Sequence, residues 1–255
     1  MPSELARAQD RTLFGQKSPE FAHDWHQITL ALDGAFVVRN TSGAWTTPPG
    51  AAVWVPAGAR HSVEPLPRAR SRTIYLRRDL MRRARQTCAV LALTPLVNAI
   101  ADHLNTNGAL VENDVTAKRL CQVLVDQLAP LAELPLFVPA LRSPLAQRVA
   151  AALAADPSDT PRIPDLAGAL ELSGRTIERA FLADASMSVG EWRQRSRVCR
   201  AIGLLAEGMA VKDVALETGY ATPTAFITAF KKYAGTTPGR LSNTKNTKNT
   251  KTISF

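Results

Sequence analysis

The sequence contains little cysteine, and its cysteines are far apart. Cys88, Cys121 and Cys199 are the three cysteines, and no two of them form a CxxC pair. This spacing excludes a zinc site built from paired cysteines, and the odd number excludes a complete disulfide framework. We therefore expect three buried thiols.

Long apolar segments are also missing. No apolar run approaches the roughly 18 residues that cross a bilayer, and the start, MPSELARAQDRTLFGQK, is too polar for a secretory signal. The sequence thus predicts a soluble, cytoplasmic protein without a membrane partner. Its 255 residues, 45% of them hydrophobic, suffice for one large core or two smaller ones. Two domains are the favoured interpretation.

Acidic residues are outnumbered by basic ones. The chain has 31 Lys and Arg against 22 Asp and Glu, and residues 142–255 hold 16 of the basic and 10 of the acidic side chains. This surplus favours a polyanionic partner, although a merely basic soluble surface explains the charge equally well. One arginine cluster in the first half is interpreted as a solvated surface: Arg68, Arg70, Arg72, Arg77, Arg78, Arg82, Arg83 and Arg85.

Short strands with turn signals fill residues 27–75. The segments ITLAL, AFVVRN, AWTTPPG and AAVWVP are separated by Asp33-Gly34, Ser42-Gly43 and a Pro-Gly pair, a pattern typical of a β-sandwich or barrel. After Leu80, apolar residues recur three and four positions apart in 81–104 and 116–134, which predicts amphipathic helices. Prolines then crowd residues 130–143 and predict an interdomain linker there.

Two segments of the second half share one pattern. In PDLAGALELSGRTIERAF, a short helix with Leu166 and Ala167 leads through a turn into a helix that buries Ile177 and Phe181. In VKDVALETGYATPTAFITAFKKY, the corresponding positions are Val214, Ala215, Phe226 and Phe230. A small alanine in each first helix lets the two helices approach closely. Each segment therefore predicts a helix-turn-helix.

The second helix of such a unit places its polar side in a major groove about 12 Å wide. Side chains near its N-terminal end read base edges, whereas flanking cations add affinity for phosphates. The candidate base readers are Arg175, Thr176 and Arg179 in the first unit and Thr222, Thr224, Ala225 and Thr228 in the second. The candidate phosphate contacts are Lys231, Lys232, Arg193 and Arg240.

The stretch DVALETGYATPTAFITAFKKYAGTTPGRL resembles the C-terminal signature of the AraC/XylS family of bacterial transcription regulators. The shared positions are Gly219-Tyr220, Phe226, Phe230, Gly235 and Thr237-Pro238. The resemblance covers roughly residues 142–241. It implies two helix-turn-helix subdomains joined by a long helix, about Val189–Glu207, which presents both recognition helices to neighbouring major-groove segments.

Two positions depart from the family pattern. Glu171 stands in the first turn where the family often has glycine, and it would be strained at a positive φ. Thr228 stands where many relatives have a basic residue, and Arg179 is its counterpart in the first unit. Sequence readout is therefore expected to lean on the first unit.

The N-terminal half resembles the cupin barrel at two motifs. Gly50, Pro56, Gly58 and His61 follow the order of the second motif. The first motif, as it occurs in a subgroup of these regulators, falls on Phe21, His23 and Gln27, where Phe21 replaces a histidine and Gln27 a carboxylate. Oxygenase chemistry needs about three protein ligands, commonly two histidines and one carboxylate. The missing carboxylate argues against a catalytic cupin.

A divalent transition metal is one candidate effector, held by His23 and His61 with His26 or Gln27 as a further ligand. The alternative is that these histidines form hydrogen bonds or line a pocket for an organic effector. Four aromatic residues are candidates for the wall of that pocket or for plain core: Trp25, Phe36, Trp45 and Trp54.

A helix over about 116–128 would place apolar residues on one stripe, namely Leu120, Val123, Leu124 and Leu128. Packing against its own barrel is one interpretation. In the family that the sequence resembles, this region commonly supplies a dimer interface, and the resemblance implies a homodimer. Double-stranded DNA is the main expected partner, and RNA polymerase is a further candidate.

The sequence thus predicts an α+β protein of two domains, an N-terminal cupin-like β-barrel with helices and a C-terminal all-α tandem helix-turn-helix module. The expected boundaries are 1–20 for an N-terminal arm, 21–79 for the barrel, 80–129 for a helical dimerisation segment, 130–143 for the linker, 144–241 for the DNA-binding domain with units at about 163–183 and 211–234, and 242–255 for a disordered tail.

The expected function is a sequence-specific transcription regulator, controlled by a small molecule or metal in the cupin-like domain, and not an enzyme. One alternative is a metal-dependent cupin enzyme with an accessory DNA-binding domain. Another is an architectural protein that binds DNA without sequence preference. Threonine-rich recognition helices weigh against that second alternative.

Overall fold

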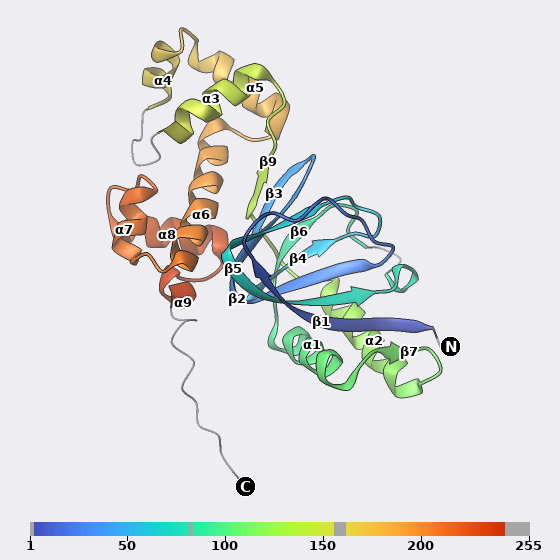
Figure 1. The fold of residues 1–255 in the computed structure, drawn as a ribbon. Coiled ribbons are helices and arrows are strands. Elements are labelled where there is room, and N and C mark those ends of the chain that lie inside the picture. The colour runs from blue at the N-terminus through green and yellow to red at the C-terminus, as the bar shows by residue number, and fades with distance from the viewer. Residues whose placement is uncertain (1–2, 82–83, 156–161, 243–255) are drawn as a thin grey trace. The chain divides into compact units, whose positions relative to one another are not determined.

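The computed structural model describes residues 3–81, 84–155 and 162–242. The chain forms two compact units, the first extending to Leu134 and the second covering Pro135–Ser242 together with Thr41–Ala44 (Figure 1). The first is built on a β-sheet and the second on helices, which confirms the predicted two-domain α+β class. No helix in these ranges is both long and apolar enough to cross a membrane. The tail predicted after residue 242 lies outside the described residues.

The first unit is organised by an antiparallel sheet whose strands follow the order β7-β1-β5-β2-β4-β6-β8, with β3 paired to β2. The strands are β1 (Glu4–Phe14), β2 (His26–Asn40), β3 (Gly43–Thr47), β4 (Ala51–Val55), β5 (Ser62–Leu76), β6 (Ala89–Ala92), β7 (Leu110–Val111) and β8 (Glu133–Leu134). The two longest, β2 and β5, have 15 residues each and pair along most of their length.

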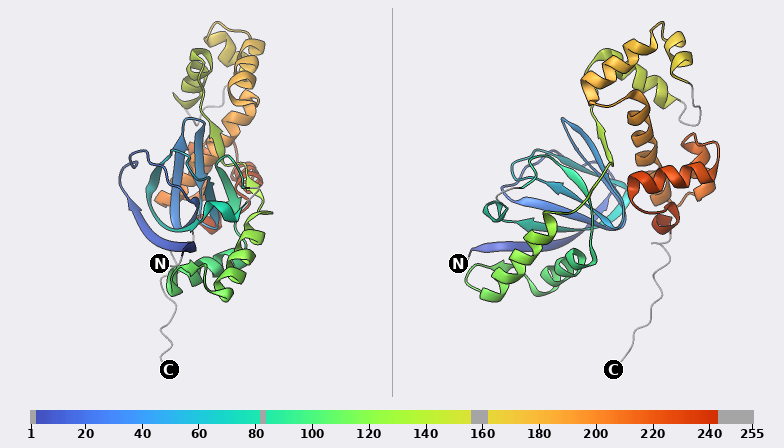
Figure 2. Two further views of the ribbon diagram at one scale, coloured as in Figure 1. Left: turned by 90° about the vertical axis from the view of Figure 1, so that its right-hand side faces the viewer. Right: turned by 180° about the vertical axis from the view of Figure 1, so that it is seen from behind.

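Strand β2 runs through Asp33 and Gly34, where the sequence predicted a turn between two strands. That prediction is wrong because the register with β5 shifts beside both residues, which makes the pair a bulge within one strand. Gly34 has φ +66°, and a Cβ there would lie 2.1 Å from the carbonyl oxygen of Arg68. The Asp33 carboxylate accepts a hydrogen bond from Gly34 N at 3.0 Å. The long strands bend at such sites, and the sheet curls (Figure 2).

One face of the sheet is apolar and packs against helices α1 (Pro95–Asn107) and α2 (Val115–Leu128). Leu30, Ile74 and Leu91 from the strands share a core with Leu104 of α1 and Leu124 of α2. Full burial of one such side chain stabilises the fold by roughly 1.5–3 kcal/mol. Successive strand residues point to opposite faces of the sheet. Because one face of the strands is buried in this core, only the opposite face is available to bind a ligand.

Helix α2 directs most of the predicted apolar stripe into its own unit. Leu124 and Leu128 are buried, Leu120 packs against the same core in a partly buried position, and Val123 is 41% exposed. Cys121 is buried beside them, and burial raises the pKa of its thiol to about 11. Packing against its own sheet is therefore the main role of this stripe.

The other two cysteines differ in burial. Cys88 is buried, and burial raises the pKa of its thiol to about 11, whereas Cys199 is only partly buried. The prediction of three buried thiols is thus confirmed for two residues.

The opposite face of β1, β5 and β2 carries polar side chains. Strand register places them in rows, Arg7 with Tyr75 and Gln27, and then Gln9 with Thr73 and Thr29. The Gln27 amide donates to the Thr29 hydroxyl at 2.8 Å, and the hydroxyl oxygens of Thr29 and Thr73 lie 3.1 Å apart. Because Gln27, Thr29 and Thr73 are buried, this face forms a polar interior opposite the α1–α2 core.

The helical prediction for residues 81–104 is wrong in its first half. Ala89–Ala92 form β6, which pairs with β4, and α1 begins only at Pro95. A short apolar run fits a buried strand as well as a helix, and the Thr94 cap sets the start of α1. The expected arm 1–20 contains β1, and the expected linker 130–143 contains β8 and β9 (Phe137–Pro139).

Three arginines of the cluster interpreted as a solvated surface have structural roles. They form ion pairs, Arg72 with Asp10 and Asp102, Arg77 with Asp79 and Glu112, and Arg85 with Glu133. Arg72 is only 8% exposed, and the hydrogen bonds that it donates to Asp10 raise the pKa of its guanidinium. The interpretation was wrong for these three because a guanidinium can bridge several acceptors between strands and helices. Arg82 and Arg83 lie outside the described residues.

The second unit is helical, with one long helix in its middle. Its helices are α3 (Pro144–Ala155), α4 (Ile163–Ala169), α5 (Gly174–Ala185), α6 (Val189–Glu207), α7 (Val211–Glu217), α8 (Pro223–Ala234) and α9 (Pro238–Ser242). Helix α6 has the predicted bounds. Ser173, Ser188 and Thr222 cap α5, α6 and α8 with side-chain oxygens, and Gly208 and Gly235 end α6 and α8 in left-handed conformation.

The segment before α3 is tied to α6 within this unit. Trp192 Nε1 donates to the carbonyl oxygen of Pro139 at 3.3 Å, and Arg195 Nη1 donates to that of Phe137 at 3.4 Å. Arg195 is itself held by Glu191 one turn earlier, at 2.7 Å. Strand β9 is therefore anchored on the helix that joins the two helical hairpins.

We expect Gly34→Ala to lower the free energy of unfolding of the first unit by about 2 kcal/mol or more, because it adds a backbone clash to a strained φ. The matched control is Gly50→Ala, at φ +82° with no atom within 4 Å of the added Cβ, where strain alone should cost about 1 kcal/mol. Urea unfolding of both variants measures the difference. Equal losses would contradict the bulge as described.

Candidate nucleic-acid interface

Two helical hairpins in the second unit have the same turn geometry. In the first, Leu172 N donates to the carbonyl oxygen of Ala167 at 2.8 Å, and in the second Tyr220 N donates to that of Ala215 at 2.9 Å. Both alanines are at most 4% exposed. A larger side chain at either position would push the hairpin apart. The repeat recognised in the sequence is thus a structural repeat of the helix-turn-helix type.

The residue that closes each turn has a positive φ. It is Gly219 in the second hairpin, with φ 73°, and Glu171 in the first, with φ 56°. The strain predicted at Glu171 is therefore present, since a side chain in this region costs about 1 kcal/mol or more. The first turn follows the same path as the second despite lacking glycine.

The inner side of each recognition helix is aromatic and aliphatic. Ile177 and Phe181 of α5 are fully buried, as are Phe226 and Phe230 of α8, and the rings of the latter two lie 5.4 Å apart. The predicted inward residues are confirmed. Their anchoring leaves the opposite sides of α5 and α8 exposed for a ligand.

The outer side of α5 presents two arginines. Arg175 and Arg179 are exposed, and no hydrogen bond or ion pair engages their guanidiniums within the part of the chain that the structure describes. The acidic residues of the same helix are occupied: Glu178 accepts from Val189 N at 3.3 Å, and Asp184 accepts from the backbone of residues 142 and 143. Those two backbone hydrogen bonds lower the pKa of the Asp184 carboxyl. The donors of the two guanidiniums are therefore available to a partner.

The hydroxyl of Thr176 has a local role. Its oxygen lies 2.8 Å from that of Ser173, the capping residue of α5. Thr176 remains partly exposed at the N-terminal end of the helix, where side chains of a recognition helix meet base edges.

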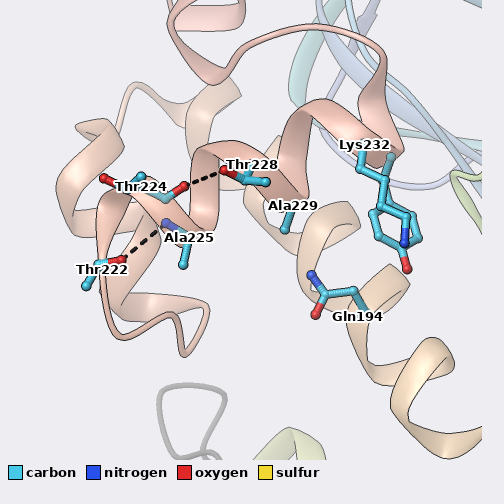
Figure 3. Close-up of a pocket in the computed structure, with 8 residues that line it drawn as sticks. Gln194, Thr222, Thr224, Ala225, Thr228, Ala229 and Lys232 are labelled. Atoms are coloured by element: carbon cyan, nitrogen blue, oxygen red, sulfur yellow. Dashed lines mark hydrogen bonds between the residues drawn. The ribbon is translucent and has the colours of Figure 1, made fainter.

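The outer side of α8 forms a shallow concave surface of about 630 Å³, lined by Thr222, Thr224, Ala225, Thr228, Ala229, Lys232, Tyr233 and Gln194 of α6 (Figure 3). All four predicted readers of the second unit are in this set. Two of their hydroxyls are already engaged: Thr222 accepts from Ala225 N at 3.2 Å, and Thr228 donates to the carbonyl oxygen of Thr224 at 3.0 Å. The surface is thus rich in methyl groups as well as hydroxyls.

Gln194 was not among the sequence candidates. It lies on α6 and donates from Nε2 to the Tyr220 hydroxyl at 2.5 Å, which fixes its amide beside α8. Periodicity shows only that this position is not part of the core. Its place beside the second recognition helix depends on the crossing of α6 and α8, which the sequence pattern does not specify.

The candidate phosphate contacts differ in exposure. Lys231 and Arg240 are exposed, and Lys232 is exposed with its ammonium 5.5 Å from the centre of the Tyr233 ring. Arg193 is partly buried on α6. The two lysines occupy the last turn of α8, where positive charge also stabilises the helix dipole.

The cupin-motif residues divide between the two faces of the sheet. His23 and His61 come together, with ring centres 5.2 Å apart, and Phe21 lies 4.3 Å from His61. His26 instead stacks on Trp54 at 4.8 Å and accepts from Ala57 N. The amide of Gln27 is held by Thr29 on the polar face. The structure therefore pairs two of the predicted metal ligands and directs His26 elsewhere.

His23 and His61 are oriented by main-chain carbonyls. His23 Nδ1 lies 2.5 Å from the carbonyl oxygen of Trp25, and His61 Nδ1 lies 2.9 Å from that of Ala59. A carbonyl oxygen can only accept a hydrogen bond, so each Nδ1 carries a proton. Each Nε2 is then the ring nitrogen that can act as an acceptor. Both Nε2 atoms are buried, and neither has a hydrogen-bond partner among the residues that the structure describes.

This arrangement suits a metal ligand in orientation but supplies few donors. Within the described residues, no group of three or more His, Cys, Asp and Glu side chains is placed to hold a metal ion. Two nitrogens fall short of the roughly three protein ligands of a typical transition-metal site. A metal effector remains a prediction.

The aromatic residues considered for a pocket wall are mostly core. Phe36, Trp45 and Trp54 are each at most 4% exposed, whereas Trp25 is partly exposed. Trp54 Nε1 donates to the carbonyl oxygen of Arg85 at 3.0 Å, so its polar atom is satisfied inside the unit. The plain-core interpretation is confirmed for these three.

A tandem helix-turn-helix module in one chain with an antiparallel sheet domain is the architecture of a DNA-binding regulator with a separate sensory domain. Residues 8–135 match the AraC-like ligand binding domain, and residues 166–244 match a helix-turn-helix domain. The chain belongs to the AraC family of transcription regulators.

Two relatives are themselves named as transcriptional regulators. NimR of Escherichia coli K12 is 30% identical over 223 residues, which are 88% of this chain and 81% of NimR. RipA of Corynebacterium glutamicum is 36% identical over 93 residues, which are 36% of this chain and 28% of RipA. Among solved structures, ToxT of Vibrio cholerae with a bound unsaturated fatty acid is 13% identical, with 95% of this chain and 96% of ToxT covered and a TM-score of 0.38.

Replacing the strained residue of the first turn should stabilise the module. We expect Glu171→Gly to raise the free energy of unfolding by about 0.5–1 kcal/mol, because relief of strain exceeds the added freedom of the unfolded chain. Gly219→Ala, at the matched position of the second turn, should lower it by about 1 kcal/mol. Thermal unfolding of both variants tests the pair. A loss of stability in Glu171→Gly would mean that its side chain contributes more than its backbone costs.

The buried histidines predict a loss of stability in mild acid. Burial lowers the pKa of His61 and of His26 below the ordinary value of 6.5. The unfolded chain therefore takes up protons at a higher pH than the folded chain, so the free energy of unfolding is highest above pH 6.5 and falls as the pH drops below it.

Urea unfolding at several pH values between 7.5 and 5.5 measures this fall. His61→Gln and His26→Gln should each flatten it, whatever their effect on stability at neutral pH, because each removes one group that titrates differently in the two states. His103→Gln, on the exposed side of α1, serves as the matched control. A slope unchanged by either buried substitution would contradict the assignment.

Proposed function

We propose that this regulator recognises its DNA site mainly through α5, with Arg175 and Arg179 as base-reading side chains and Thr176 as a third reader. The observation that carries the proposal is that both guanidiniums are exposed and unpaired within the described chain. The nearby carboxylates of Glu178 and Asp184 instead accept hydrogen bonds from backbone N–H groups. An arginine fork matches the O6 and N7 acceptors of guanine in the major groove.

Helix α8 supplies a different kind of contact in this proposal. Thr222 and Thr228 use their hydroxyls within the helix, which leaves their methyl groups and that of Ala225 for the methyl group of thymine. Thr224 is exposed beside them. Lys231 and Lys232, one turn further on, would contact phosphates. The second unit then contributes position and affinity, and the first unit contributes more of the base discrimination.

Gln194 extends the candidate surface beyond the recognition helices. Its amide lies next to α8, and one of its two amide hydrogens is directed to Tyr220. The remaining donor and acceptor capacity suits a phosphate or a base edge. We include Gln194 with the DNA-binding residues on this ground.

The sheet domain is the natural place for a controlling ligand, since the family model that it matches is a ligand-binding domain. A ligand changes DNA binding only if it binds two states of the protein with different affinity. A small organic molecule on the polar face of the sheet is favoured over a metal held by His23 and His61, because that pair supplies only two ligands.

Homodimerisation and contact with RNA polymerase complete the proposal. The exposed Val123 on α2 supports a dimer contact at this helix, although most of its apolar stripe is buried in the same chain. An activator would also contact the polymerase. A regulator that binds DNA and polymerase would act in the cytoplasm.

The test begins by selecting DNA from a random pool with the full chain and sequencing what is enriched. On the selected site, Arg175→Ala and Arg179→Ala should each weaken binding by about 1–3 kcal/mol and relax the preference at one base pair. Lys231→Ala should weaken binding to all sequences alike and reduce the slope of log K against log salt by about 0.9. Arg119→Ala, exposed on α2, is the control for loss of one positive charge.

Two outcomes would count against the proposal. Undiminished selectivity in both arginine variants would remove α5 as the main reader. Failure of the wild-type chain to enrich any sequence at moderate salt would favour the alternative of an architectural protein.

A further inference from the structure

The polar face of the sheet in the first unit opens into a pocket at its β1 edge. The pocket encloses about 610 Å³, and its wall includes Arg7, Gln9 and Arg11 of β1, Tyr75 of β5, and Phe21 and His23 before β2. Alternation along β1 explains the first three, since residues 7, 9 and 11 point to the same face. The pocket is large enough for a small organic molecule.

The charge of this wall is positive. Among the described residues, two arginines line the pocket and no acidic side chain does. Asp10 lies between them in sequence but belongs to the opposite face, where it pairs with Arg72. Glu4 is the acidic residue nearest to Arg7, at 3.8 Å, and both side chains are about half exposed, so their attraction is strongly screened.

The Arg7 guanidinium is oriented by aromatic rings, and the Arg11 guanidinium is open. The guanidinium carbon of Arg7 lies 5.1 Å from the centre of the Tyr75 ring and 5.6 Å from that of Trp25. Such contacts orient the cation over aromatic faces and leave its edge donors available. No hydrogen bond or ion pair engages the Arg11 guanidinium within the described residues.

His23 adds its imidazole ring to the same wall. Its Nδ1 is committed to the Trp25 carbonyl. Its Nε2 is buried and has no hydrogen-bond partner among the described residues, so a ligand in the pocket contacts the ring and does not bond to this atom. Phe21 and Tyr75 supply flat apolar surface beside it.

We propose that this pocket binds an organic anion, a flat apolar body that carries a carboxylate or phosphate for Arg7 and Arg11. The inference rests on the proposed function only in its consequence, namely that this anion is the controlling ligand of the regulator. Binding itself is independent of DNA. The two can therefore be tested separately.

The test uses isothermal titration calorimetry on the full chain without DNA. The probes are 4-hydroxybenzoate, its neutral analogue 4-hydroxybenzamide, and phenyl phosphate. We expect 4-hydroxybenzoate to bind about tenfold or more tightly than the amide, since charge-assisted hydrogen bonds are roughly twice as strong as neutral ones. The phosphate arm identifies which anionic group the arginines prefer.

Arg7→Gln and Arg11→Gln should each reduce the preference for the anion, and the double variant should abolish it. Arg119→Gln, the same change at an exposed arginine of α2, is the matched control and should bind as the wild type does. Equal binding of acid and amide, a preference that survives in the double variant, or no binding of any probe at millimolar concentration would overturn the proposal.

The same variants also separate the two hypotheses. If Arg7→Gln and Arg11→Gln lose the anion but still enrich the wild-type DNA sequence, the pocket is assigned and the reading surface is intact. If the wild-type chain binds the anion and enriches no DNA, the pocket stands and the proposed DNA recognition fails.

Discussion

The close approach of two short helices across a tight turn is the constraint on which the DNA-reading unit depends. Ala167 and Ala215 are buried where a larger side chain would separate the helices, and each turn closes on a residue with positive φ. When the turn is formed, the aromatic residues of the second helix reach the core. The polar side of that helix then faces away from the core. The scaffold and the reading surface are thus two results of the same packing.

In the sheet unit, one strand likewise serves both a core and a polar surface, because its side chains alternate between the two faces with a period of two residues. Alternation along β1, β5 and β2 sends Leu30 and Ile74 toward α1 and α2, and sends Thr29 and Thr73 to the other face. An apolar core and a polar interior then share the same strands. The bulge at Gly34 shifts the register, so a side chain there would disturb the assignment of faces as well as the local backbone.

The sequence pattern was informative where a feature is local and repeated. The period of the helices, the small alanines and the glycines at turns predicted both helical hairpins, and the family resemblance implied the bounds of α6. It was uninformative where the outcome depends on distant partners. The run 89–92 becomes a strand because β4 offers an unpaired edge, Asp33-Gly34 becomes a bulge because β5 continues alongside, and Gln194 reaches α8 only through the crossing of two helices. Pairing and crossing are properties of the folded chain.

The arginines show why net charge alone could not locate a site. A formal charge of +9 is equally compatible with Arg72, which is buried and satisfied by two aspartates, and with Arg179, which is exposed and unpaired within the described chain. A paired guanidinium has its donors occupied, and binding a new anion would require breaking those bonds. An unpaired one keeps its donors free for an anion that arrives with its own charge. The candidate sites are therefore located by how each arginine is held. Arg175 and Arg179 on α5 have no carboxylate partner within the described residues, and Arg7 on β1 has only the screened contact with Glu4. The count of positive residues permits both sites but locates neither.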